Sequence, residues 1–490
     1  MHHRDRDYRA PSVPIRRRYM GQPPEVRPVI RGIGSVRFIR GSSLAAAGLL
    51  FWLGLASGQS PSLTRTARIV ETKPDLPTTL VFPTFLGRWG LQRARQVHAR
   101  YFLGGLSRFD DPQDIAVTVL DARDDPADER DDDEITVYGV NSGRSEIIYN
   151  PTMSSLATYG GAGSGIGEFR HPNGIDADPA GTVVVADTGN NRVAVLFNDG
   201  HLISHRRFLD EAAPGDSLAA PYDVALTPDD GVWVSDSGNG RLVLFNLNGT
   251  VRQVVDLQGV MDQPGALAVT HPRQRWSYFR EHALFVAERN GRSLVKLDVD
   301  DNERLRVAAT SAEAGERSSL QIRYLTTDFF ANLWATDGAG HQIHKFDRNL
   351  NFLDSFGARG RRSMQFRSPT GIGMWRRFGQ VIIAEAEGAQ YYWVGADARD
   401  LSAAQLGDQL EVSYHLTGYS YVTIRIQPVG GEPVEIVRRR FRRIGLRKEV
   451  LQLDDDRPLN WLEVVVEPSY SSSTYREKVF RMSFQRGTPY

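Results

Sequence analysis

Three aspartates stand in similar local sequences, each a few residues after a proline. Asp114 lies in PQDIAV, Asp176 in PNGIDA and Asp223 in PYDVAL, and each segment has the alternating apolar pattern of a short strand. Carboxylates that converge from separate strands could bind Ca²⁺, although aspartates at such places more often cap turns. Ca²⁺ is therefore the one cofactor that the residue types suggest, and otherwise no cofactor is expected.

Other catalytic chemistry finds little support in the residue types. The chain has no Cys, which excludes disulfides, thiolate metal sites and cysteine nucleophiles. A zinc site needs imidazoles that converge from several elements. His171 stands directly before Pro172, but the residues at the matching places are Ala220, Gln263 and Ser368. No metal ligand set and no catalytic residue are therefore predicted.

A basic and aromatic segment, HPRQRWSYFREH at residues 271–282, has the composition of a recognition loop. Trp, Tyr and Arg are enriched among the residues that dominate binding energy at interfaces. The candidate ligand- or partner-binding side chains are Arg273, Arg275, Trp276, Tyr278, Phe279 and Arg280. The alternative is that Trp276 and Phe279 only pack against a neighbouring element.

A repeated pattern shows which elements must position these residues. VVVADTGNNRVAVLF at 183–197 aligns with VWVSDSGNGRLVLF at 232–245, and both have β-rich runs around a Gly-Asn turn, as a β-hairpin requires. Another strand precedes each hairpin and a fourth follows it. Four short antiparallel strands at a period of about 40–60 residues form one blade of a β-propeller.

Six copies of this pattern begin at Pro112, Pro172, Pro221, Pro264, Tyr324 and Pro369. They resemble the NHL repeat family, and this resemblance implies a six-bladed β-propeller over residues 101–396. In the first copy, Ile135–Tyr149 aligns position for position with Val183–Phe197, which places Arg144 on Arg192. An Asp–Arg bridge across the hairpin is expected to be structural where both residues occur.

The last copy supplies only three strands before the sequence changes character, so another segment must complete the ring. Tyr101–Leu106 resembles a fourth strand and precedes the first copy, and we expect it to close the last blade. A seventh blade from 66–100 is the alternative, although that segment has none of the repeat's marks.

The predicted ring places two long loops on one face. Both Asp121–Glu134 in the first copy and 271–282 in the fourth connect a first strand to a second, and blades one and four of six lie opposite each other. One rim of the channel is therefore expected to be acidic and the other basic and aromatic. The three aspartates named above are expected near the channel.

Residues 397–490 are predicted to form a small antiparallel β-sandwich, because longer alternating strands replace the repeat. Their first three strands resemble the Ig-like domain of the flagellar hook-capping protein. The basic run VRRRFRRIGLRK at 437–448 could bind an anionic glycan or an acidic partner. Alternatively, it is a solvated strand face that Asp454–Asp456 balances.

The chain begins with features of export. A basic leader precedes the apolar run Leu44–Leu55 and the small residues Ala56–Gly58, so residues 1–58 are predicted to be a signal peptide or an uncleaved N-terminal anchor. Residues 59–100 are expected to be a linker. Without residues 1–58 the chain has 49 basic and 56 acidic residues, a net charge of −7, which disfavours nucleic-acid binding.

These observations predict an exported, non-catalytic binding scaffold of the bacterial cell envelope. It would be located in the periplasm, on the outer surface or outside the cell, and would recognise a protein or a glycan through loops on one propeller face. Contact with a membrane is expected only through an uncleaved anchor. The alternative is a propeller lyase or a lactonase-type hydrolase with one divalent metal ion in the channel.

Overall fold

A computed structural model describes residues 64–81, 93–105, 107–124, 135–152, 155–299, 305–311, 320–470 and 476–484. The predicted leader at 1–58 lies outside these residues, as does most of the acidic loop. Residues 61–490 form one compact unit. Among the described residues, no helix is long and apolar enough to cross a membrane.

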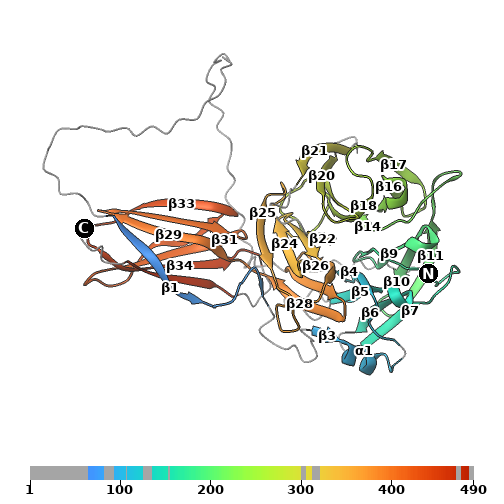
Figure 1. Cartoon of the computed structure of the whole chain (residues 1–490), viewed down its shortest axis with the longest axis horizontal. Helices are drawn as coiled ribbons and strands as arrows, with labels where there is room; N and C mark the ends of the chain where they lie inside the picture. The colour runs from blue at the N-terminus through green and yellow to red at the C-terminus, as the bar shows by residue number, and fades with distance from the viewer. Residues whose placement is uncertain are drawn as a thin grey trace, which may run out of the picture. The chain divides into compact units, whose positions relative to one another are not determined.

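Six antiparallel sheets of four or five strands each dominate the described chain, and they are arranged around a common axis as the blades of a propeller (Figure 1). Blade A contains β4 (Pro112–Val119), β5 (Ile135–Asn141), β6 (Glu146–Thr152) and β7 (Ser155–Gly160); blade B contains β8 (Ile175–Ala177), β9 (Thr182–Asp187), β10 (Arg192–Asn198) and β11 (Ile203–Leu209); blade C contains β14 (Val224–Thr227), β15 (Gly231–Asp236), β16 (Arg241–Asn246) and β17 (Val251–Asp256). Blade D contains β18 (Pro264–Thr270), β19 (Ala283–Glu288), β20 (Leu294–Val299) and β21 (Leu305–Ser311); blade E contains β22 (Ile322–Thr327), β23 (Leu333–Asp337), β24 (Gln342–Phe346) and β25 (Phe352–Phe356); blade F contains β26 (Pro369–Trp375), β27 (Gln380–Glu385) and β28 (Gly388–Val394), with β2 (Leu80–Val81) and β3 (Arg93–Arg95). A two-stranded hairpin, β12 (Glu211–Ala213) and β13 (Asp216–Ser217), links blades B and C. The six-bladed all-β propeller predicted from the repeat is therefore confirmed.

The hairpin between the second and third strands explains the Asp and Arg of the repeat. In blades B and C a short 3₁₀ turn, η2 (Thr188–Asn190) or η3 (Ser237–Asn239), connects these strands. Arg192 Nε donates to Asp187 Oδ2 at 2.7 Å, and Arg241 bonds Asp236 at the same distance. Both aspartates are fully buried at their blade edges, so the bridge is structural, as predicted.

The predicted alignment of the first copy is wrong by two residues. Its turn η1 (Ser142–Arg144) is followed by Ser145 in the left-handed conformation, the place that Asn191 takes in blade B. Asn141 therefore occupies the Asp187 position and Glu146, not Arg144, occupies the Arg192 position. The hydrogen bond across the hairpin survives with donor and acceptor exchanged, because Asn141 Nδ2 donates to Glu146 Oε1 at 2.7 Å.

The segment that completes blade F differs from the one predicted. Leu80–Val81 and Arg93–Arg95 pair with β28, and Arg93 also forms an ion pair with Glu385 at 2.6 Å. Tyr101 lies in the helix α1 (Gln96–Phe102) with 81% of its surface exposed, and Leu106 lies outside the described residues. An upstream segment does close the ring, but the strand Tyr101–Leu106 was a wrong prediction.

The C-terminal strands form two sheets around one core. One sheet contains β29 (Ala398–Leu406), β30 (Gln409–Leu416) and β33 (Gly445–Gln452); the other contains β31 (Ser420–Pro428), β32 (Val434–Arg442), β34 (Leu459–Pro468) and β35 (Lys478–Phe484). Alternate apolar residues such as Val412 and Val464 face this core. The expected linker at 59–100 contributes a strand, because β1 (Arg65–Lys73) pairs with both β29 and β35 and joins the two sheets.

Candidate functional site

The innermost strands of all six blades surround a channel with a cavity of about 480 Å³. Side chains or backbone of β4, β8, β14, β18, β22 and β26 line it. Each innermost strand pairs with its blade on one side only, so the amides of its other edge need different partners. Carboxyl groups in the channel can meet this requirement by accepting hydrogen bonds from these amides.

The three predicted carboxylates each accept a hydrogen bond from the innermost strand of the next blade. Asp114 Oδ2 accepts from Ile175 N at 3.2 Å, Asp176 Oδ2 from Leu226 N at 2.8 Å, and Asp223 Oδ2 from Leu267 N at 2.8 Å. Asp114 and Asp176 also line the cavity, whereas Asp223 is not among its lining residues. The structure therefore gives these aspartates a role in holding neighbouring blades together.

Asp114 and Asp223 form a buried acid pair. They stand at the same place in blades A and C, on either side of Gly174, and a Cβ on this glycine would lie 2.1 Å from Asp223 Oδ1. Burial raises the pKa of both carboxyls, and the charge of Asp223 raises that of Asp114 further; the pKa of Asp223 reaches about 8 although a hydrogen bond with Asp114 lowers it. Burial also raises the pKa of Asp176 to about 6. At neutral pH the pair therefore retains a proton.

This donor set does not suit a divalent cation. Ca²⁺ prefers several ionised carboxylate oxygens, whereas burial raises the pKa of all three carboxyls and each already accepts a backbone N–H group. Among the described residues, no three His, Asp or Glu side chains gather closely enough to hold a metal ion.

The cavity widens into a mouth that the loops between first and second strands surround. One side carries Asp121 and Asp124 of blade A, Asp178 of blade B and Asp230 of blade C, and the other carries Arg273 and Arg275 of blade D and Arg376 and Arg377 of blade F. The acidic loop and the basic loop predicted to face each other thus meet at one cavity. Residues 125–134 of the acidic loop lie outside the described part.

Trp276 is the aromatic centre of the basic side. The guanidinium carbon of Arg275 lies 4.9 Å from the centre of the Trp276 ring, and that of Arg377 lies 5.1 Å from it. Such cation–π contacts hold guanidinium groups in place. Of the residues predicted to bind a partner, Arg273, Arg275 and Trp276 line the channel mouth.

The other half of the predicted loop has a packing role. The Tyr278 ring contacts Phe330 and Tyr419, and Tyr278 N donates to Phe329 O at 2.7 Å. Phe279 also packs against Tyr419 of the C-terminal sheets. Arg280 donates to carbonyls within its own loop. None of these three residues lines the channel cavity.

Sequence reasoning missed the contributions of the shorter loops. Arg376 and Arg377 follow Trp375 at the same place in blade F that 271–282 occupies in blade D. Asp178 comes from a four-residue turn in blade B and Asp230 from a three-residue turn in blade C. Aligning the ends of all six first strands would have identified them, because equivalent loops share one face of a propeller.

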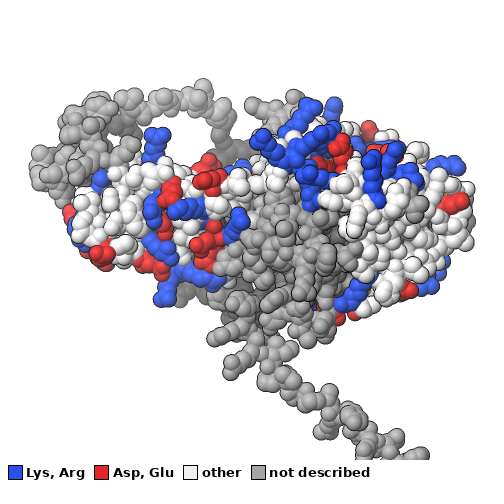
Figure 2. Space-filling view, turned by 90° about the horizontal axis from the view of Figure 1, so that it is seen from below, with Lys and Arg blue, Asp and Glu red and all other residues white. Residues whose placement is uncertain are grey.

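The basic run at 437–448 belongs mostly to a paired strand surface. Arg439 bonds Glu467 at 2.9 Å, Arg442 bonds Glu449 at 2.6 Å, and Lys448 bonds Glu411 at 2.8 Å. On the face that Figure 2 presents, basic and acidic side chains lie side by side over the C-terminal sheets. The balancing acids are glutamates of β34, β33 and β30, whereas the sequence had suggested Asp454–Asp456.

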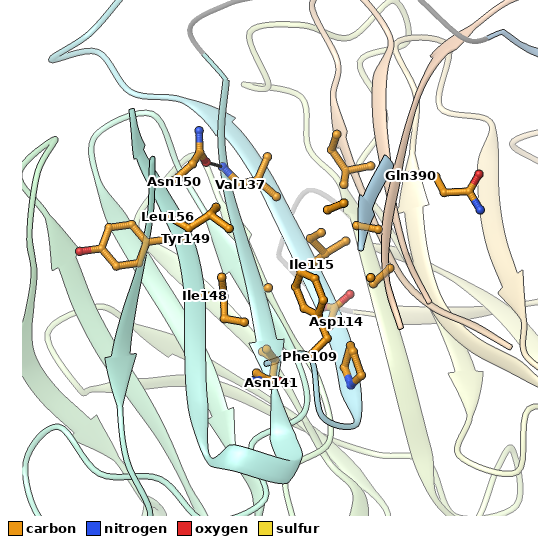
Figure 3. Close-up of a pocket in the computed structure, with 18 of the residues that line it drawn as sticks. Phe109, Asp114, Ile115, Val137, Asn141, Ile148, Tyr149, Asn150, Leu156 and Gln390 are labelled. Carbon is orange, nitrogen blue, oxygen red and sulfur yellow. Dashed lines mark hydrogen bonds between the residues drawn. The ribbon is translucent and has the colours of Figure 1, made fainter. Parts of the chain in front are cut away.

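A second, smaller crevice of about 200 Å³ lies between blades F and A, where the ring closes. Figure 3 shows Phe109, Ile115 and Ile148 gathered between the strands of blade A and the strand that carries Gln390. Small residues such as Gly139 and Ala384 also line it, and Asn141 and Gln390 add polar groups to its wall.

Comparison with known proteins agrees with this fold. Residues 169–196 match the NHL repeat. Over 49 residues the chain is 49% identical to Protein lin-41 of Caenorhabditis elegans, a match that covers 10% of this chain and 4% of that protein. Among solved structures, virginiamycin B lyase from Staphylococcus aureus is similar with 14% identity and a TM-score of 0.37, over 53% of this chain and 76% of that one. The calcium-binding protein regucalcin from Agrobacterium tumefaciens has 9% identity and a TM-score of 0.40, over 59% and 90%.

Proposed function

We propose that this NHL-repeat propeller is a non-catalytic binding scaffold that recognises a protein or glycan partner at the mouth of its channel. The proposal rests on a difference between the charged groups inside the channel and those at its mouth. Inside, Asp114, Asp176 and Asp223 bond to backbone amides. At the mouth, Arg273 and Arg275 are exposed and form no ion pair among the described residues.

We further propose that the protein works outside the cytoplasm, in the cell envelope. The basic leader and apolar run within residues 1–58 support export, and the absence of cysteine is compatible with any redox compartment. The net charge of −7 beyond residue 58 argues against nucleic acid as the partner. A membrane would be contacted only if the leader remains as an anchor.

The test compares capture of envelope proteins and glycans by the wild type and by two matched variants. Arg273→Gln/Arg275→Gln removes two charges at the mouth, whereas Arg438→Gln/Arg440→Gln removes two charges from the sandwich. We expect the first variant to lose any specifically captured partner and the second to retain it. Equal capture by both variants would contradict the proposal.

The alternative, a metal-dependent lyase or lactonase, makes a different prediction. It needs a divalent ion held by channel carboxylates, so removing Asp176 would abolish metal binding. Titration of the purified protein with Ca²⁺ by calorimetry separates the two functions. We expect no saturable binding that depends on Asp176; stoichiometric binding that Asp176→Asn removes would favour the enzyme.

A further inference from the structure

The charges at the channel mouth are sorted by blade. All four acidic side chains at the mouth come from blades A, B and C, and all four basic ones come from blades D and F. Blades A to C and D to F are the two halves of the ring. Among the residues that the structure describes, the mouth is therefore dipolar, with four carboxyl groups on one side and four guanidinium groups on the other.

Several of these charged groups have no hydrogen-bond or ion-pair partner among the described residues. Asp124 Oδ1 is buried and accepts no hydrogen bond. Arg273 and Arg275 form no ion pair with any described residue, in contrast to Arg192 and Arg241, which are bridged in their hairpins. An unpartnered buried carboxylate oxygen costs free energy unless a ligand supplies the donor. The acidic side of the mouth can therefore accept a hydrogen bond from a ligand, and the basic side can donate one.

The balance of charge restricts the class of ligand. A simple anion would be attracted by the guanidinium side and repelled by the aspartates. A simple cation would be attracted by the aspartates and repelled by the guanidinium side. A molecule with an ammonium group at one end and a carboxylate at the other satisfies both sides. Guanidinium groups bind carboxylates through two parallel N–H donors, and such charge-assisted hydrogen bonds are strong.

The size of the cavity points to more than a single ion. Its volume of about 480 Å³ lies within the range of roughly 300–1,000 Å³ that is typical of pockets for small organic ligands. We propose that the channel mouth binds a short zwitterionic peptide, with its free amino group at the aspartates of blades A to C and its free carboxylate at Arg273 and Arg275. This inference rests on the proposed function and specifies the chemistry that the mouth recognises.

The experiment uses tetra-alanine as the probe in four forms: free at both ends, N-acetylated, C-amidated, and blocked at both ends. Calorimetric titration of the full chain should show binding of the free peptide. Blocking either end should weaken this binding by about tenfold or more, because a hydrogen bond to a charged group is worth roughly 1.5–3 kcal/mol. Raising the salt concentration should weaken it further.

Variants assign each end of the peptide to one side of the mouth. Arg275→Gln should abolish the difference between free and C-amidated peptide while leaving the effect of N-acetylation. Asp124→Asn should abolish the difference between free and N-acetylated peptide while leaving the effect of C-amidation. Arg438→Gln, on the exposed sandwich surface, should leave both effects unchanged. The two specific losses measure a coupling between residue and ligand end that a folding defect would not produce.

The outcomes that would contradict this inference differ from those that would contradict the proposed function. Equal affinity for free and doubly blocked peptide, or no binding of free peptide at 10 mM, roughly the weakest affinity that matters for such a site, overturns the inference. If partner capture still depends on Arg273 and Arg275 in that case, the scaffold function stands without the zwitterion. If peptide binding behaves as expected but capture is unaffected, the scaffold function fails instead.

Discussion

Single side chains in this propeller accept hydrogen bonds from backbone amides that the blades leave unpaired. The innermost strand of a blade exposes amide groups to the channel, and a carboxyl group from the preceding blade accepts from one of them at Asp114, Asp176 and Asp223. Bringing two of these carboxyls together over Gly174 has a cost, because both cannot ionise in a buried site. Stability should therefore depend on pH through this pair.

Asp223→Asn should make the stability less dependent on pH. The pKa of Asp223 is raised from 3.8 to about 8 in the folded protein, so the folded state loses stability relative to the unfolded state as pH rises through this interval. The amide oxygen of Asn still accepts from Leu267 N without ionising. We expect the variant to gain about 1 kcal/mol or more over the wild type between pH 5 and pH 8, since a pKa difference of one is worth about 1.4 kcal/mol.

Urea unfolding at the two pH values measures this effect. Asp455→Asn is the control, because Asp455 pairs with Arg457 on the surface, and it should leave the pH dependence as in the wild type. A wild-type slope in Asp223→Asn would show that Asp223 is ionised in the folded protein at neutral pH.

Two glycines at blade junctions should respond to alanine in opposite ways. Gly139 faces the crevice between blades F and A, and its added Cβ would come no closer than 3.9 Å to Ile148 O. Gly139→Ala should stabilise the protein by about 0.5–1 kcal/mol, by restricting the unfolded chain and filling space. Gly174→Ala should destabilise it by about 1–3 kcal/mol, because the new methyl group overlaps Asp223. Thermal unfolding of both variants tests the pair; destabilisation by Gly139→Ala would show that the crevice is not open to a methyl group.

At the scale of elements, local chemistry was predictable and distant pairing was not. The hairpins around Asp187 and Asp236 follow from Gly, Asn and Arg within about ten residues. The alignment error in blade A arose because Ser145 adopts the left-handed conformation that Asn191 and Gly240 adopt elsewhere. Ser is not a residue that marks such a position in a sequence.

The segments that close the ring and complete the sandwich have no periodic pattern of their own. Arg93–Arg95 pairs with Gly388–Gln390, and Arg65–Lys73 pairs with β35, each across most of the chain. Nothing in their local composition identifies these partners. The two long loops at the channel mouth could be predicted from the sequence. The packing role of Tyr278 could not, because it depends on Tyr419, which is distant in sequence.

The loop at 271–282 should separate by mutation into a packing part and a binding part. Phe279→Ala should lower the stability by about 1–3 kcal/mol, because it removes a half-buried ring that contacts Tyr419 and the Arg348 guanidinium. Arg273→Gln should leave stability within about 0.5 kcal/mol of the wild type, as expected for an exposed side chain. Thermal unfolding measures both; an unstable Arg273→Gln variant would mean that this arginine also has a structural role.

At the scale of the whole molecule, the N-terminal segment connects the two parts of the fold. β1 joins the two C-terminal sheets, and β2 and β3, a few residues later, complete blade F. Polar contacts reinforce this connection: Thr78 N donates to Asp397 Oδ2 at 3.0 Å, and Lys478 Nζ donates to Leu76 O at 2.6 Å. Ring closure and sandwich assembly therefore depend on one stretch of 31 residues, from Arg65 to Arg95.

Truncation on either side of β1 should separate these two roles. A chain that begins at Ser62 retains β1 and should unfold as the longer chain does. A chain that begins at Asp75 keeps β2 and β3, so the propeller can close, but β29 and β35 lose their shared partner strand. Exposed edges of this kind pair with other chains. We therefore expect the shorter chain to aggregate on size-exclusion chromatography and to lose the sandwich's share of the unfolding enthalpy in calorimetry while the propeller's share remains. Identical calorimetric profiles for the two chains would show that β1 is not needed to hold the sheets together.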